Sequence, residues 1–274
     1  MAAEFDLVCV CDSLSQLYET TRPDLVVVSV SEVSTRKICA ECFGFPWTVL
    51  MEKPPGIHRI EAESILDSAQ SHGRRALVGL NRRFYSSTRA AIKSLDEHEG
   101  KRFIHIQDQQ NLTTGPGPGY TQDVIDNWMF ANSIHVVDLL RVFGRGDVVS
   151  VNPILPWTGP ETDVMLAEVK FSSGDFGLYE GIWKGPGPWS VSVTVPEIRW
   201  EMRPLEQAAF QLDGSRTLED APLHAWDMQF KPGFRAQAEM AVAAGLGQPS
   251  GSTTLADAVE TMRLIERIYV TSGP

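Results

Sequence analysis

Short apolar runs alternate with amphipathic stretches through the first third of the chain. The apolar runs are found at 24–30, 47–52 and 75–80. Between them, residues 34–44 and 57–72 place apolar side chains at helical spacing, and Gly44 and Gly73 stand where those helices end. Continuous apolar strands joined through helices by short connections are typical of a parallel, right-handed sheet covered on both faces. The pattern therefore predicts a doubly wound strand–helix–strand–helix–strand unit.

Single positions predict finer features of this unit. Ser34 or Thr35 is expected to cap the start of the first helix. One face of the second helix carries the apolar residues Ile60, Ile65, Leu66 and Ala69. Residues 5–11 form one further apolar run. Because proteins rarely leave the edge of an apolar strand bare, we expect 5–11 to pair directly beside 24–30.

The pattern changes beyond residue 88. Residues 101–107 alternate in the manner of a strand, and residues 127–143 are apolar nearly all round, which predicts a helix buried between layers. Alternating stretches follow at 163–171, 176–183, 189–195 and 198–203, and two helices close the chain at 234–245 and 255–270. Turn residues separate the alternating stretches, which is typical of a mostly antiparallel sheet. We therefore predict a truncated doubly wound parallel (Rossmann-type) unit in 1–88 and an α+β domain with an open, mostly antiparallel sheet in 89–274.

Composition excludes several classes of protein. The chain has 274 residues, of which 43% are hydrophobic and 22% charged, as is ordinary for a soluble globular protein. Its net charge of −11 argues against nucleic-acid binding, which needs a basic face. No stretch approaches the roughly 20 apolar residues of a membrane span, and the amino terminus lacks the features of a signal peptide. We expect a cytoplasmic protein with no nucleic-acid or membrane partner.

The four cysteines are weak candidates for a metal or redox site. Cys9 and Cys11 lie in the predicted strand at 5–11, and Cys39 and Cys42 lie in the first predicted helix. A zinc site would need two close pairs with suitable loop geometry, and a C-x-C sequence on a strand is a poor half of one. We interpret all four as small buried apolar residues and expect no bound metal.

Polar side chains follow each of the three predicted parallel strands. They are Ser29 and Ser31, then Glu52 and Lys53, then Asn81, Arg82 and Arg83. Open α/β sheets bind their ligands just outside the carboxyl ends of their strands. A lysine at such a strand end stands where these proteins place reacting groups, whereas Arg83 is equally well explained as a surface charge. We expect a site here, with Lys53 as a member.

A polar stripe marks the predicted helix at 127–143. Asn132, His135 and Asp138 lie three residues apart and drift slowly around one face of the helix. Each buried polar group costs about 1–3 kcal/mol if it is left unpaired. A His–Asp pair that satisfies itself in the core is the plainer explanation. We favour a site instead, because a histidine within reach of a strand-end lysine suggests proton transfer at a carbinol carbon.

A dinucleotide-binding turn is missing from its usual place. That turn needs G-x-G-x-x-G after the first strand, so that the backbone can approach the pyrophosphate, yet the first glycine of this chain is Gly44. We therefore expect the second half of a nucleotide-dependent dehydrogenase, with the first half absent.

The chain resembles the Gfo/Idh/MocA family, which includes glucose–fructose oxidoreductase and inositol dehydrogenase. The matching segments are Asp24–Val28, Glu52-Lys53-Pro54, Asn81–Phe84, Ile134–Leu140 and Met262–Glu266. The resemblance runs from about residue 5 to the end of the chain. The combination of Glu-Lys-Pro at a strand end with His-x-x-Asp on a helix is fairly specific, whereas either motif alone would be weak.

The resemblance implies an NAD- or NADP-dependent oxidoreductase that transfers hydride between the cofactor and a sugar, sugar-acid or cyclitol hydroxyl. By that resemblance Lys53 would hold the substrate hydroxyl, His135 would be the general acid/base, and Asp138 would orient the substrate. We take Asn81, Arg82 and Asn132 as further substrate-binding candidates, and Ser29, Ser31 and Glu52 as cofactor-binding candidates.

Two departures from the family leave two hypotheses. Ala131 stands where many members carry an acidic residue one turn before the histidine, although Asn132 beside it can take that place. The family's first strand, glycine turn, first helix and second strand have no counterpart, and Asp12 matches a later element than the ribose-binding acid. The chain is then an oxidoreductase that is impaired or depends on a missing cofactor-binding segment, as a mis-set start codon would produce. The alternative is a non-redox sugar-binding or regulatory protein that has lost the cofactor site.

The predicted antiparallel sheet is also a candidate interface for a homo-oligomer. Its strands carry Phe171, Phe176, Tyr179, Trp183, Trp189 and Trp200. An open sheet has two faces, the local helices can cover only one, and a large exposed apolar face usually marks an interface. The resembled family also associates through this sheet. The loop Gly115–Gly119, whose alternating prolines exclude a helix, is a candidate lid over the site.

Overall fold

The apolar runs of the first third pair as a parallel sheet of order β1-β2-β3 in the computed structural model, which describes residues 9–269. The strands are β1 Leu25–Val28, β2 Thr48–Met51 and β3 Ala76–Val78, and the helices are α1 Leu14–Thr21, α2 Glu32–Cys42 and α3 Arg59–Ser71. The outer edge of β3 is covered, because the N–H of Val78 donates to the carbonyl of Thr253 at 3.0 Å. The predicted strand–helix order is confirmed.

β1 is less covered than its run of valines predicts. It is an edge strand within the described residues, and Val27 is 63% exposed whereas Val28 is 6% exposed. The prediction that 5–11 forms a strand beside it is wrong for residues 9–11, which form no strand and leave Val10 75% exposed. Residues 5–8 lie outside the described residues. Although α2 and α8 (Phe234–Gly245) contact β1, neither covers Val27, so the prediction of burial on both faces is also wrong.

Two details of the helices differ from the predictions. α2 begins at Glu32 with Ser31 as its N-cap, so the prediction of Ser34 or Thr35 as the cap is wrong. In α3 the buried side chains include Ala62 and Ile65, but Ile60 is 41% exposed. The inward face of α3 is therefore narrower than its apolar positions indicate. Gly73 follows the helix with φ +61°, a left-handed conformation that suits glycine, as predicted.

The second sheet has eight strands in the order β11-β10-β9-β8-β4-β7-β6-β5. They are β4 Phe103–Gln109, β5 Val148–Leu155, β6 Val164–Phe171, β7 Phe176–Ile182, β8 Trp189–Thr194, β9 Ile198–Met202, β10 Ala209–Leu212 and β11 Glu219–Asp220. All pairs are antiparallel except β4–β7, so the mostly antiparallel sheet is confirmed. The remaining helices are α4 Ser86–Leu95, α5 Gln122–Asp126, α6 Ile134–Phe143, α7 Ala225–Gln229, α8 Phe234–Gly245 and α9 Leu255–Tyr269. The domain boundary expected at residue 88 falls within α4 and stays a prediction.

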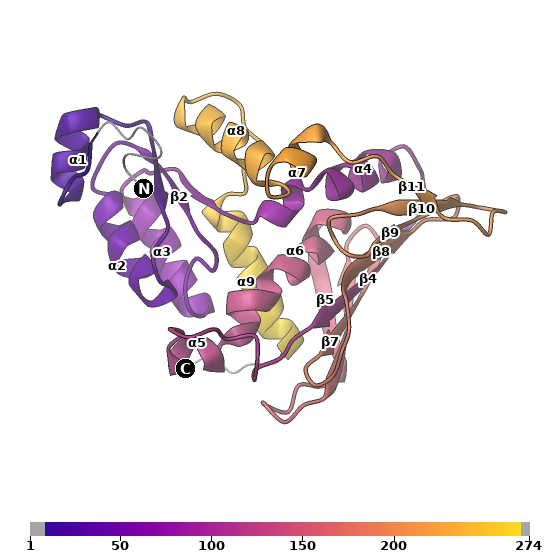
Figure 1. The fold of residues 1–274 in the computed structure, drawn as a ribbon. Coiled ribbons are helices and arrows are strands. Elements are labelled where there is room, and N and C mark those ends of the chain that lie inside the picture. The colour runs from indigo at the N-terminus through magenta and orange to yellow at the C-terminus, as the bar shows by residue number, and fades with distance from the viewer. Residues whose placement is uncertain (1–8, 270–274) are drawn as a thin grey trace.

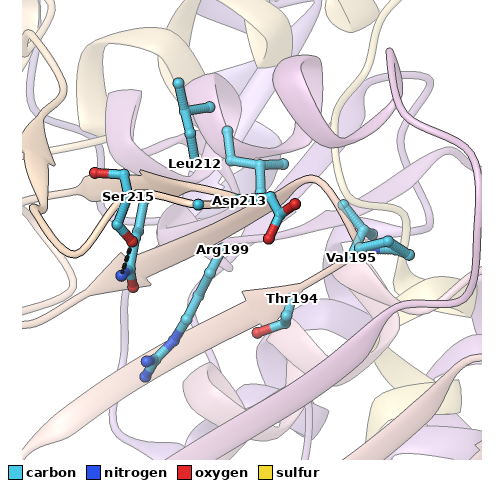
Figure 2. A pocket seen from close by; sticks show the side chains of 10 residues that line it. Thr194, Val195, Arg199, Leu212, Asp213 and Ser215 are labelled. Atoms are coloured by element: carbon cyan, nitrogen blue, oxygen red, sulfur yellow. Dashed lines mark hydrogen bonds between the residues drawn. The ribbon is translucent and has the colours of Figure 1, made fainter.

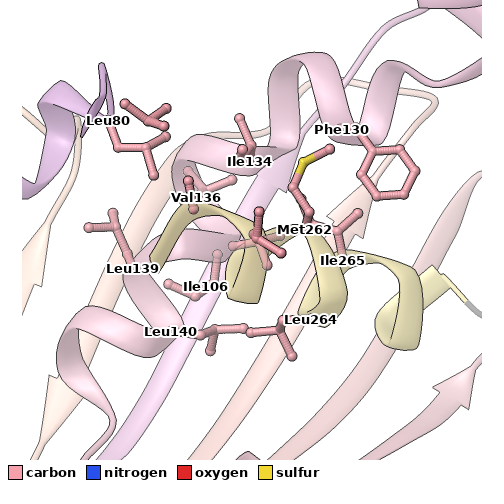
Figure 3. Packing of buried hydrophobic residues seen from close by; sticks show 14 of the residues in the cluster. Leu80, Ile106, Phe130, Ile134, Val136, Leu139, Leu140, Met262, Leu264 and Ile265 are labelled. Carbon is pink, nitrogen blue, oxygen red and sulfur yellow. The ribbon is translucent and has the colours of Figure 1, made fainter. Parts of the chain in front are cut away.

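A buried layer of helices separates the two sheets (Figure 1). α6 packs against β4 on one side and α9 on the other, and Figure 3 shows Ile106 of β4, Leu139 of α6 and Met262 of α9 among the buried side chains of this layer. Each of these side chains is at most 1% exposed. Burial of one such side chain contributes about 1.5–3 kcal/mol. α9 also packs against α3, so it ties the small parallel sheet to the large one.

The opposite face of the large sheet has no described helix over it (Figure 1). Of the six aromatic residues expected on this sheet, Phe171, Tyr179, Trp183 and Trp200 are buried, and Phe176 and Trp189 are half-buried. The uncovered face carries the stacked rings of Phe103 and Phe176, whose centroids are 5.7 Å apart. None of the described helices has the length and apolar character needed to cross a membrane.

Candidate functional site

Lys53 lies just beyond the carboxyl end of β2, at the edge of the small sheet where ligands of such folds bind. Its Nζ donates a hydrogen bond to the carbonyl oxygen of Ala131 at 2.8 Å. Ala131 belongs to a π-helical turn, Met129–Ser133, which interrupts the single helix predicted over 127–143. Such wide turns recur at functional sites, because they change the direction in which backbone and side-chain groups point. Burial lowers the pKa of Lys53, although the nearby carboxylate of Glu32 opposes this.

His135 lies in the first turn of α6 and is 6% exposed. Its Nδ1 is buried and has no hydrogen-bond partner among the described residues. Burial holds the pKa of His135 well below its ordinary value, and the positive charges of Arg82 and Lys53 lower it further. The imidazole is therefore neutral at pH 7 and retains a ring nitrogen that can take up a proton. Lys53 contacts the carbonyl of Ala131, four residues before His135 in the chain, and the proximity of the two predicted residues to one ligand stays a prediction.

Asp138 is bound by partners other than His135. Its carboxylate accepts hydrogen bonds from Nε and Nη2 of Arg83 at 2.5 and 2.6 Å, and from Oγ1 of Thr261 at 2.7 Å. Both carboxylate oxygens of Asp138 are thus engaged by partners other than His135, and the explanation by a self-contained His–Asp pair is wrong. Arg83 is neither a free surface charge nor open to a ligand. The role of Asp138 in orienting substrate stays a prediction, and its observed contacts join the end of β3 to α6.

Arg82 has surroundings unlike those of Arg83. Its guanidinium lies over the ring of Trp189 from β8, with Cζ 4.6 Å from the ring centroid, and its Nε is buried without a partner among the described residues. Burial lowers the pKa of Arg82. The amide of Asn81, another predicted substrate-binding residue, donates to the carbonyl of Pro232 at 3.2 Å. This bond fixes the segment before α8 against the turn that carries Arg82.

Asn132 is the first member of a buried hydrogen-bond network that extends into the large sheet. Asn132 Nδ2 and Trp128 Nε1 both donate to Oε1 of Gln110, at 2.8 and 2.9 Å. Nε2 of Gln110 donates to Asp108 at 2.5 Å, and the hydroxyl of Tyr179 donates to the same carboxylate at 2.6 Å. Asp108 is fully buried, and this burial raises the pKa of its carboxyl group. The network holds Asn132 in one orientation and places a buried acid behind the site.

The predicted cofactor-binding residues lie at strand ends but form no cradle for a pyrophosphate. Ser31 Oγ is hydrogen-bonded to Ser34 Oγ at 2.9 Å, Glu52 accepts from the neighbouring backbone N–H at 3.3 Å, and Ser29 is exposed. Glu32 in the first turn of α2 would repel a phosphate at that helix terminus. None of the turns after β1, β2 and β3 contains G-x-G-x-x-G. The described residues therefore do not fit the pyrophosphate of a dinucleotide.

Three surface cavities lie away from Lys53 and His135. One is formed by the β8–β9 and β10–β11 turns, where Figure 2 shows Arg199 and Asp213 among its lining residues. The second lies between α6, α9 and β5, and the third lies on the uncovered face of the large sheet. The loop Gly115–Gly119 has no helix or strand, as predicted, and its role as a lid stays a prediction.

The cysteines and other potential metal ligands form no metal site in the described part of the chain. No group of three or more His, Cys, Asp or Glu side chains over residues 9–269 is arranged to hold a metal ion. Cys39 and Cys42 are buried, which confirms their interpretation as core residues, and burial raises the pKa of Cys39 to about 12. Cys9 and Cys11 are half-buried in a segment that is not a strand, so their predicted strand position is wrong.

Four residues around the site were not predicted as members from the sequence: Asp108, Gln110, Trp189 and Lys231. Asp108 and Gln110 carried a signal, because they continue the inward-facing alternation of Ile104 and Ile106 in β4. A polar residue at an inward position needs a partner, which is a reason to look for a network. Trp189 and Lys231 carried no such signal, since only the tertiary structure brings β8 and the segment before α8 to Arg82.

Comparisons with sequence-family models and with curated proteins find no match to this chain. Solved structures of several dehydrogenases nevertheless share its fold. UDP-N-acetylglucosamine 3-dehydrogenase GnnA from Acidithiobacillus ferrooxidans is 15% identical, with a TM-score of 0.74 over 98% of this chain and 84% of that chain. Levoglucosan dehydrogenase in complex with NADH and levoglucosan is 14% identical, with a TM-score of 0.78 over 97% of this chain and 82% of that chain.

The WlbA dehydrogenase from Chromobacterium violaceum, solved with NADH and UDP-GlcNAcA, gives the same result. It is 17% identical, with a TM-score of 0.71 over 98% of this chain and 81% of that chain. Likeness at these identities establishes the fold alone. It confirms the predicted fold class, a Rossmann-like unit followed by a domain with an open sheet.

Proposed function

We propose that this chain provides the substrate-binding and proton-transfer groups of a nicotinamide-dependent oxidoreductase that acts on a sugar, sugar-acid or cyclitol hydroxyl. The observation that carries the proposal is the hydrogen bond from Lys53, at a parallel strand end, to the carbonyl of Ala131, which lies four residues before a neutral, buried His135 whose Nδ1 is unpartnered among the described residues. The NADH and sugar ligands named for the solved structures of the same fold support it.

In this proposal the described residues carry out the proton transfer. Oxidation of a secondary alcohol to a ketone releases one hydride and one proton. Neutral His135 accepts the proton from the substrate hydroxyl, and the ammonium group of Lys53 stabilises the negative charge that develops on the oxygen. Asn132, held by Gln110, lies next to Ala131, the position at which many family members carry an acidic residue, and would take its place. A nicotinamide cofactor, NAD or NADP, would be the hydride acceptor by resemblance.

Turnover measurements with two substitutions test the proton-transfer role. With a panel of sugars, sugar acids and cyclitols and either cofactor, Lys53→Ala or His135→Ala should lower kcat by about 10²–10⁴-fold, as is typical of general acid–base groups. The exposed residues Lys170 and His72 provide matched controls, since Lys170→Ala and His72→Ala remove the same groups elsewhere. Near-normal turnover in either site variant would remove that residue from the mechanism.

We further propose that tight cofactor binding needs a segment that the 274-residue chain does not supply. The absence of a glycine turn after any described parallel strand and the exposed edge at Val27 support this. Titration of NADH and NADPH with fluorescence readout should then show weak or undetectable binding by the chain. Micromolar or tighter binding would contradict the proposal. An in-frame glycine-rich strand–turn–helix in the DNA upstream of Met1 would identify the segment.

A non-redox sugar-binding or regulatory protein is the second candidate. The same lack of a pyrophosphate cradle favours it, because that cradle supplies much of a dinucleotide's anchoring. Calorimetric binding of a sugar, together with no turnover by either cofactor even when the glycine-rich segment is added, would support this candidate over the oxidoreductase.

A further inference from the structure

Arg82 is a half-buried cation without a counterion among the described residues. Its neighbour Arg83 makes a bidentate ion pair with Asp138, and Arg59, Arg102 and Arg145 each pair with a carboxylate as well. Arg82 forms no ion pair with any described residue, and its Nε is buried without a hydrogen-bond partner. Its planar group is held against Trp189 instead. A desolvated guanidinium with open donors is costly unless an anion reaches it.

Two acidic residues near Arg82 are engaged elsewhere. Glu206 and Asp108 both act on Arg82 electrostatically, but neither forms an ion pair with it. The carboxylate of Asp108 is hydrogen-bonded to Tyr179 and Gln110, and Glu206 accepts from the hydroxyl of Tyr85 at 3.4 Å. The donors of Arg82 are thus left for a group that does not belong to the described chain.

Lys231 adds a second free cation at the same place. It lies in the segment before α8, with Nζ 4.8 Å from the centroid of the Phe234 ring, and it forms no ion pair within the described part of the chain. The charges of Arg82, Lys53 and Lys231 all act on His135. Although Glu32 and Glu52 act on Lys53 electrostatically, none of the three cations forms an ion pair with a described carboxylate, which in a protein of net charge −11 indicates a local site for negative charge.

The segment that carries Lys231 is fixed to the turn that carries Arg82. Asp227 accepts hydrogen bonds from the backbone N–H of Ser86 at 2.6 Å and of Gly233 at 2.9 Å. Gly233 has φ +75°, and a Cβ there would lie 2.3 Å from the carbonyl oxygen of Asn81, so only glycine allows this approach. The backbone segments that carry the two cations are therefore fixed against each other, although the side chain of Lys231 is exposed.

We propose that the ligand of this site carries an anionic group, a carboxylate or a phosphate ester, which Arg82 and Lys231 bind beside Lys53 and His135. The inference rests on the proposed function for the place of the reacting hydroxyl, and it narrows the substrate to an acidic sugar derivative. The guanidinium of Arg82, which lies over the Trp189 ring, carries its donors as a planar fork, which matches the paired oxygens of either anion.

Calorimetric binding without cofactor tests this inference. The probes are D-glucuronate, its neutral methyl ester, D-glucose, D-glucose 6-phosphate and inorganic phosphate. At least one anionic probe should bind about 10- to 100-fold more tightly than its neutral counterpart, the range expected for charge-assisted hydrogen bonds. Preference for glucuronate over the phosphates, or the reverse, identifies the anion. Equal binding of acidic and neutral probes, or no binding of any anion, would overturn the inference.

Arg82→Gln and Lys231→Gln should each abolish the preference for the anion, whereas Arg235→Gln, an exposed arginine of α8, should retain it. Arg82→Met should leave the Tm of the ligand-free protein unchanged or raise it, because it removes an unpaired buried cation. A Tm lowered by several degrees would show a structural role and overturn the inference.

Selective binding of acidic probes without any turnover would refute the proposed function but not this inference. Turnover that depends on His135 but shows no preference for acids would refute this inference alone.

Discussion

Replacing Arg83 with methionine tests whether the Arg83–Asp138 pair holds the site together. The pair joins the end of β3 to α6, so it fixes the strand end that carries Arg82 relative to the helix that carries His135. Asp138 is 1% exposed, and Arg83→Met leaves its carboxylate without a charge partner in the core. Both side chains are apolar along their length, so the methionine can occupy much of the space of the arginine.

The magnitude follows from the contacts of the Asp138 carboxylate. It accepts three hydrogen bonds, two from Arg83 and one from Thr261, and the substitution removes the two charged ones. At roughly 1.5–3 kcal/mol for each hydrogen bond to a charged group, the loss is about 3–6 kcal/mol. Breaking one partner of a buried ion pair costs about 3–5 kcal/mol in comparable cases. We therefore expect Arg83→Met to lower the free energy of unfolding by about 3–5 kcal/mol.

Urea unfolding followed by circular dichroism measures the effect as a shift in midpoint at unchanged slope. The double variant Arg83→Met/Asp138→Leu removes both charges and should recover most of the loss, since apolar replacements of a buried pair are often neutral. Arg82→Met is the matched control one residue away and should lose no stability. The reasoning is refuted if Arg83→Met costs less than about 1 kcal/mol, or if the double variant is as unstable as the single one.

Three further predictions concern pH and assembly. The folded pKa of His135 lies below its ordinary value, so His135 should remain a neutral base as the pH falls from 8 to 6.5. Protonation of His135 should therefore cause no decline in kcat/KM for alcohol oxidation over that range. A decline caused by His135 and centred above pH 6.5 would contradict its assignment as the base. Burial raises the pKa of Asp175, but hydrogen bonds from Arg145 and backbone N–H groups outweigh this and lower it from 3.8 to about 2. Asp175 should then contribute about 2 kcal/mol of stability above pH 5 that is lost as the pH falls through the folded pKa of about 2, so urea midpoints of wild type and Asp175→Asn should converge between about pH 4 and 2. The uncovered face of the large sheet, with Phe103 and Phe176 stacked on it, should form a homo-oligomer, and a monomer by light scattering at micromolar concentration would exclude this.

Much of the fold could be predicted from the sequence because hydrophobic periodicity is a local property. The helix α8, Phe234–Gly245, has the predicted bounds, and β6, β7, β8 and β9 of the large sheet fall within the predicted alternating stretches, whereas β5, β10 and β11 were not predicted. The strand-end position of Lys53 and the burial of His135 also follow from local pattern. Periodicity identifies the face of an element that is buried, but it does not identify what lies against that face.

The tertiary structure decided how the polar groups are paired. Arg82 and Arg83 are adjacent and chemically identical, yet Arg83 is neutralised by Asp138 whereas Arg82 stacks on Trp189 with open donors. The exposure of Val27 likewise depends on whether a neighbouring element reaches β1, which its own apolar run does not specify. Pairing energies depend on contacts between elements far apart in the chain, and a short run of sequence contains no record of those partners. The charge left unpaired at Arg82, on which the proposed anion site rests, is therefore a property of the assembled fold.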